Sequence, residues 1–139
     1  MIGATPVASI SRTRLWTGRV ITAWLGLFLV FDAVVKVLKS SAAVAGTTRL
    51  GYPEHLIAIL GIVELVSLIA YVVPRTSIVG AILLTGYLGG ATATQVRVES
   101  AWFLLPVVLG GLMWVALCLR DPRVGSLLLG HGDRRVPGP

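Results

Sequence analysis

RTSIVGAILLTGYLGGATATQVR, residues 75–97, is the stretch that decides the fold. The twenty-one residues between its two flanking arginines have no formal charge. Because an α-helix rises about 1.5 Å per residue, a segment of this length can cross the roughly 30 Å hydrocarbon core of a bilayer. We therefore predict a transmembrane helix over residues 77–96.

The same stretch has small residues at every fourth position, with a GxxxG pair alongside. A spacing of four places such a row on one face of a helix, and small side chains let neighbouring helices approach closely. We predict that this face is a helix-packing surface. Its residues are Ser77, Ala81, Thr85, Gly86, Gly89, Gly90 and Ala93.

The composition of the whole chain is typical of an integral membrane protein. Of its 139 residues, 55% are hydrophobic and 13% are charged, and the mean hydropathy is +0.87, whereas soluble domains are about 25% charged. Each of four apolar stretches, 16–38, 55–73, 77–96 and 101–119, is close to the length of about 20 residues that a spanning helix needs. We expect an all-α membrane protein. Its four-transmembrane-helix bundle would occupy residues 16–120, between tails at 1–15 and 121–139.

The basic residues indicate how this bundle is oriented. Although the net charge is +6, the lysines and arginines are scattered singly beside apolar segments, so we expect no nucleic-acid partner. Eight of them lie on the side of the bundle that holds both termini, and four lie on the other side. By the positive-inside rule, both termini should face the cytoplasm. The eight are Arg12, Arg14, Arg19, Arg75, Arg120, Arg123, Arg134 and Arg135.

Several polar residues fall inside the predicted spans and gather in the outer half of the bundle. Asp32 and Lys36 are four residues apart with the acid first, the favoured order for an ion pair on a helix. Glu64 has no partner in its own helix, so it must either stay protonated or find Lys36, Gln95 or Arg97 across the bundle. A charge near the centre of a membrane helix costs about 2.5 to 3.5 kcal/mol on insertion scales, so pairing is expected.

Two interpretations of this cluster stay open. One is a salt-bridge and hydrogen-bond network that only orients the helices. The other is a pocket, formed by Asp32, Lys36, Glu64, Gln95 and Arg97, that binds a quinone, another lipid-like molecule or a proton. Gln95 is better explained by the structural interpretation, and Arg97 by anchoring at the interface.

No catalytic motif is present. Ser-His-Asp, HExxH, P-loop and dinucleotide patterns are absent, and the glycines of residues 86–90 lack the strand-turn-helix setting of a phosphate site. A single cysteine, Cys118, excludes a dithiol within the chain. His55 and His131, at a membrane edge and in a tail, cannot form a metal site. We therefore expect no catalytic residue, no metal and no cofactor bound by this chain alone, with a quinone as the candidate ligand.

Five segments in order along the chain resemble the DoxX-like membrane protein family. They are FDAVVK (31–36), LGYPE (50–54), LGIVE (60–64), PRTSIVGAILLTGYLGGATATQVRV (74–98) and LRDPR (119–123). The resemblance implies a four-helix, multi-pass protein of a bacterial-type inner membrane. The family is named after a small subunit of an archaeal terminal quinol oxidase, also described as a thiosulfate:quinone oxidoreductase, and it has no agreed catalytic residues to transfer. Gln95 stands where many relatives have His, which weakens a proton relay through this helix.

Three functions follow as hypotheses. The first is an accessory subunit of a quinone-linked redox or oxidative-stress complex. The second is a small transporter or lipid-ligand binder that uses Glu64 and the Asp32/Lys36 pair. The third is a structural or assembly factor that binds helices through residues 77–93. The expected partners are the lipid bilayer together with other proteins of a membrane redox complex, or a second copy of the chain.

Overall fold

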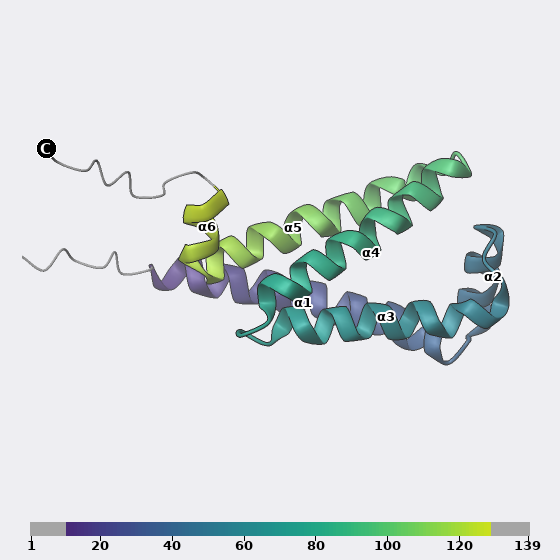
Figure 1. The fold of residues 1–139 in the computed structure, drawn as a ribbon, viewed down its shortest axis with the longest axis horizontal. Helices are drawn as coiled ribbons and strands as arrows, with labels where there is room; N and C mark the ends of the chain where they lie inside the picture. Colours follow the sequence, from purple (N-terminus) through teal and green to yellow (C-terminus); the bar gives the residue numbers. More distant parts are fainter. Residues whose placement is uncertain (1–10, 129–139) are drawn as a thin grey trace, which may run out of the picture.

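The computed structural model describes residues 11–128, and all of its regular structure there is helical (Figure 1). Four helical segments are long and apolar enough to cross a membrane: Arg12–Val37, Glu54–Val72, Ser77–Arg97 and Ala101–Arg120. They correspond to α1, α3, α4, and the 3₁₀ turn η1 (Ala101–Phe103) continued by α5 (Leu104–Arg120). The predicted four-helix membrane fold is confirmed.

The four long helices form a ring in which each packs against two neighbours. α1 contacts α3 and α5, and α4 contacts the same two helices. Eleven buried residues form the core, ten on these helices and one in the short segment 122–128. The Tyr71 hydroxyl donates a hydrogen bond to the carbonyl oxygen of Met113 within it, at 2.8 Å. The core residues are Leu25, Leu29, Leu68, Tyr71, Ala81, Leu84, Leu88, Leu109, Met113, Leu117 and Val124.

Two short helices lie where the sequence predicts a connection and a tail. α2 (Ser41–Arg49) forms within the connection 39–54, and the hydroxyl of Ser40 caps it by accepting a hydrogen bond from the Ala43 amide. α6 (Pro122–Leu128) lies in the predicted tail 121–139, and α1 begins at Arg12, inside the predicted tail 1–15. The rest of both tails, including His131, Arg134 and Arg135, lies outside the described residues.

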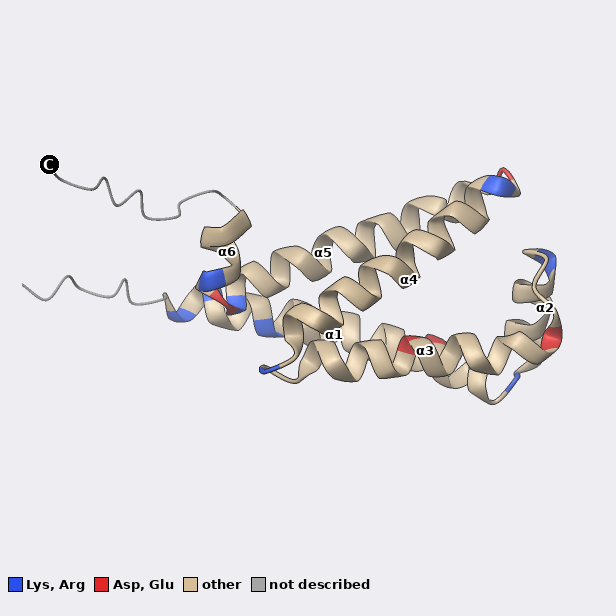
Figure 2. Cartoon of the chain, viewed as in Figure 1, with Lys and Arg blue, Asp and Glu red and all other residues tan. Residues whose placement is uncertain are grey.

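Charged residues mark the two ends of the bundle (Figure 2). We call the end that holds Arg12, Arg75 and Arg120 the terminal end, and the end that holds α2 and residues 98–100 the distal end. The terminal end is rich in arginine, whereas the distal end mixes both signs, for example Arg97 and Glu99. The orientation with both termini in the cytoplasm stays a prediction based on this asymmetry.

The hairpin between α3 and α4 contains the closest helix approach found at any glycine of the described residues. An added Cβ on Gly80 would lie only 2.0 Å from the backbone nitrogen of Tyr71, so no larger residue fits there without moving the backbone. The turn is fixed by the Thr76 hydroxyl, which donates to the carbonyl of Ala70 at 2.8 Å. α3 and α4 are therefore held together at the terminal end by a glycine outside the predicted row of small residues.

That row divides into two parts. Ser77 and Ala81 are buried against neighbouring helices, but the remaining members are exposed or only partly covered, and a Cβ on Gly86, Gly89 or Gly90 would meet nothing within 4 Å. Gly86 and Gly90 face the space left where α4 and α5 diverge from α1 and α3 toward the distal end (Figure 1), whereas Thr85, Gly89 and Ala93 line a groove between α4 and α5. Within this chain, Thr85, Gly86, Gly89, Gly90 and Ala93 border open space. Their packing against a helix of another chain stays a prediction.

Substituting Gly80 should therefore destabilise the protein far more than substituting Gly86. We expect Gly80→Ala to cost at least about 2–3 kcal/mol, because the new methyl group overlaps backbone atoms. Gly86→Ala is the matched control in the same helix, and it should be neutral or stabilising by up to about 1 kcal/mol, since alanine favours a helix. Thermal unfolding of both variants in the same detergent compares them. Equal melting temperatures would contradict the close approach at Gly80.

Candidate functional site

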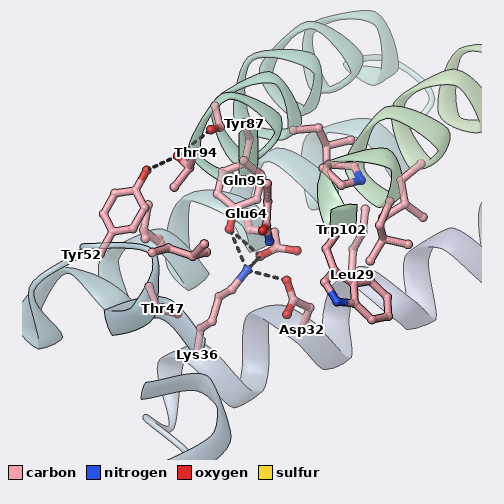
Figure 3. Close-up of a pocket in the computed structure, with 18 of the residues that line it drawn as sticks. Leu29, Asp32, Lys36, Thr47, Tyr52, Glu64, Tyr87, Thr94, Gln95 and Trp102 are labelled. Atoms are coloured by element: carbon pink, nitrogen blue, oxygen red, sulfur yellow. Dashed lines mark hydrogen bonds and ion pairs between the residues drawn. The ribbon is translucent and has the colours of Figure 1, made fainter. Parts of the chain in front are cut away.

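A cavity of about 500 Å³ opens between the four helices in the distal half of the bundle (Figure 3). We call it the distal pocket. It lies where the two helix pairs diverge, and segment 47–52 reaches it from the distal end. Its lining residues are Phe28, Leu29, Asp32, Lys36, Thr47, Leu50, Tyr52, Leu60, Glu64, Gly86, Tyr87, Leu88, Gly90, Ala91, Thr94, Gln95, Trp102, Leu105, Pro106 and Leu109.

Four polar side chains, those of Asp32, Lys36, Glu64 and Tyr87, form what we call the polar floor of this pocket. Lys36 lies at its centre. Its ammonium group donates hydrogen bonds to the Asp32 carboxylate, to Glu64 Oε2 at 2.9 Å and to the Tyr87 hydroxyl at 2.9 Å. These acceptors come from α1, α3 and α4, as the dashed lines in Figure 3 show. An ammonium group has three N–H donors, so all of them are used.

Glu64 is the most deeply buried acid of the site, with 0% of its surface exposed. Its Oε2 accepts from both Lys36 and the Tyr87 hydroxyl, each at 2.9 Å. Its Oε1 is also buried but has no hydrogen-bond partner within residues 11–128. The sequence predicted Lys36, Gln95 or Arg97 as the partner of Glu64, and the structure pairs Glu64 with Lys36.

Gly61 allows this pairing. A Cβ at Gly61 would lie 2.7 Å from the carbonyl oxygen of Ala33 and 2.9 Å from the Cβ of Lys36, so α1 and α3 nearly touch here. Gly61 is three residues before Glu64 and therefore lies on the same face of α3. The missing side chain lets the Lys36 ammonium reach the Glu64 carboxylate.

Tyr87 was not identified from the sequence as a site residue. A signal for it exists in the short turn at residues 74–76, which makes α3 and α4 an antiparallel hairpin. Glu64 precedes Arg75 by eleven residues and Tyr87 follows it by twelve, so the two side chains lie at the same depth. Counting outward from the turn would have placed Tyr87 beside Glu64.

The other predicted site residues lie nearer the distal end. Gln95 lines the pocket, whereas Arg97 does not and instead donates a hydrogen bond to the carbonyl oxygen of Leu50. Arg97 thus ties the end of α4 to the segment after α2. A second hydrogen bond joins the Tyr52 and Thr94 hydroxyls at 3.0 Å. Together these bonds connect the diverging helix pairs across the distal mouth of the pocket.

Apolar and aromatic side chains form the walls above the polar floor. Phe28 and Leu29 come from α1, while Trp102 and Leu105 come from η1 and α5. A mostly apolar cavity of 300–1,000 Å³ with a few convergent polar groups is the usual form of a small-molecule site. The distal pocket has this form, and it suits an amphiphile whose polar head reaches the floor.

A second, shallower groove lies between α4 and α5. Gly89, Ala93 and Gly111 are among the small residues that line it, and Trp114 Nε1 donates to the Thr85 hydroxyl at 2.9 Å along its edge. The groove contains no charged residue. Within the part of the chain that the structure describes, no group of three metal-ligating residues occurs.

Comparison with known proteins gives one family match. A family model described as the DoxX-like family matches residues 20–116, which is more than two thirds of the chain. The matched range includes Asp32, Lys36, Glu64, Tyr87 and Gln95. No curated protein and no solved structure gives a significant match.

The polar floor should behave as one energetic unit. We expect Lys36→Met to destabilise the protein by about 3–5 kcal/mol, because it leaves the buried Glu64 carboxylate without its ammonium partner. Adding Glu64→Gln should restore part of that loss. Chemical or thermal unfolding of both single variants and the double variant in detergent gives the coupling energy. Purely additive effects would show that the two residues do not stabilise each other.

Proposed function

Since this chain belongs to the DoxX-like family, we propose that it is an accessory subunit of a quinone-linked redox or oxidative-stress complex, with the distal pocket as its quinone site. We place it in a bacterial-type inner membrane with both termini in the cytoplasm. On this proposal the chain binds and positions the quinone, while a partner subunit supplies the electron carriers.

The observation that carries the proposal is the Asp32, Lys36, Glu64 and Tyr87 cluster on the floor of an otherwise apolar pocket. Ionisable groups inside a membrane are costly and are commonly functional. A purely structural network would not need a cavity of about 500 Å³ beside it. A quinone, in its oxidised or its reduced form, combines a polar ring with an apolar tail, and these suit a polar floor and apolar walls respectively.

The pocket is also placed where a lipid-soluble molecule could enter. Asp32 is 39% exposed at its side chain although it belongs to a membrane-spanning helix. Trp102, on the pocket wall, is 71% exposed. These exposures support a route from the surface of the bundle to the polar floor.

Gentle purification tests the proposal directly. We expect the protein, extracted with its native lipids, to contain a quinone at about one molecule per chain and to bring a redox partner protein with it. Mass spectrometry of both the lipids and the proteins measures this. Glu64→Gln should lower the quinone content, whereas Ser67→Ala should not, since Ser67 lies one turn away on α3, outside the pocket. A preparation with neither quinone nor partner would contradict the proposal.

The α4/α5 groove favours a second candidate function, assembly with a partner helix. Gly89 is exposed in this groove and has open space where a side chain would be, so a close helix could pack on it. Gly90 is less suitable for a test, because it lines the distal pocket.

Gly89→Leu should then abolish association with the partner chain and leave the quinone content unchanged. Gly26→Leu is the control, since Gly26 also has open space around it but lies on α1. Crosslinking in membranes followed by gel analysis measures the association. If Gly89→Leu associates as well as the unmodified chain, the groove does not mediate assembly.

A further inference from the structure

The floor of the distal pocket has no hydrogen-bond donor left for a ligand. All three N–H groups of Lys36 are taken by Asp32, Glu64 and Tyr87. The Tyr87 hydroxyl has one hydrogen, which it donates to Glu64 Oε2. A ligand carbonyl that reached this floor would therefore meet no free N–H or O–H group.

An acceptor, in contrast, is left over. Glu64 Oε1 is buried beside the pocket and has no donor within the described residues, although Oε2 of the same carboxylate accepts two hydrogen bonds. A buried acceptor without a partner is unfavourable, so a hydrogen bond donated by a ligand would stabilise it. Two carboxyl groups also share a single ammonium here, so the floor is richer in acceptor oxygens than in donors.

We infer that the distal pocket selects amphiphiles whose head group donates a hydrogen bond to Glu64 Oε1. The donor is a hydroxyl group or a protonated amine, and the remainder of the ligand is apolar. This inference rests on the proposed function for the location of the site. It adds that, of the two redox forms of a quinone, the hydroxyl-bearing quinol is the one that the floor holds.

Residues on the pocket wall offer a ligand a second way to bind, one that does not involve Glu64. Trp102 and Gln95 also line the pocket and have side-chain N–H groups, and neither is among the hydrogen-bond partners of Lys36. A ligand held only by these groups would bind through its carbonyl oxygens and would be indifferent to Glu64. Dependence on Glu64 therefore distinguishes binding at the floor from binding at the wall.

The test measures equilibrium binding of three probes to the full-length chain in lipid nanodiscs. They are a short-chain benzoquinol kept reduced under argon, the matching benzoquinone, and decylammonium. We expect the benzoquinol to bind at least about tenfold more tightly than the benzoquinone, the gain expected from one additional hydrogen bond to a charged group. Decylammonium should also bind. Glu64→Gln should abolish the preference by weakening benzoquinol binding, because a neutral amide replaces the charged acceptor, and Ser67→Ala should preserve it.

The outcomes separate this inference from the proposed function. Equal affinity for the two redox forms would overturn the inference that the head group donates to Glu64 Oε1, but it would leave the proposed quinone binding intact. If decylammonium binds in a Glu64-dependent way but neither benzoquinol nor benzoquinone binds, the inference about a hydrogen-bond donor is supported and the quinone proposal is overturned. Binding of none of the three probes would overturn both. If Glu64→Gln does not fold, the ratio of the two redox forms on the unmodified chain still decides.

Discussion

The rest of the structure depends on the three hydrogen bonds of one ammonium group, that of Lys36, inside the membrane-spanning part of the bundle. An isolated charge at this depth would cost several kcal/mol, so its acceptors must be close. They come from α1, α3 and α4, and these helices are therefore fixed in rotation and depth relative to one another. Glu64 cannot turn outward without losing its hydrogen bonds to Lys36 and Tyr87, which would leave Lys36 with two of its three acceptors.

The two ends of the bundle differ because close contacts occur mainly at one of them. At the terminal end, Gly80 admits the backbone of α3, and Gly18 admits α5, where an added Cβ would lie 3.0 Å from the carbonyl oxygen of Ala116. Toward the distal end, Gly86 and Gly90, which line the pocket, have no such neighbours. The helix pairs are thus joined tightly at one end and diverge toward the other. The pocket is a consequence of this divergence, and the Lys36 cluster lies at its base.

This arrangement lets the cluster combine a structural role with the ligand-binding role that we propose. Its bonds use every donor of Lys36 but leave an oxygen of Glu64 at the pocket without a donor. The two interpretations that the sequence left open are therefore compatible. The same residues orient the helices and, on our proposal, would determine which head groups the pocket accepts. The family match covers all of these residues, so the site belongs to the part of the chain that is DoxX-like.

The sequence by itself determined the number of membrane helices, the Asp32/Lys36 pair and the need of Glu64 for a partner. These follow from segment length, from a spacing of four and from the cost of a buried charge, all of which are local properties. Only the tertiary structure decided that Lys36 is the partner of Glu64, that Tyr87 joins them, and that Arg97 binds the Leu50 carbonyl and does not line the pocket. It also decided that Gly61 and Gly80 are the close-packed glycines, while the row from Thr85 to Ala93 borders open space. The physical reason is that a repeat of small residues shows where helices can approach, but the angle between them depends on contacts along their whole length.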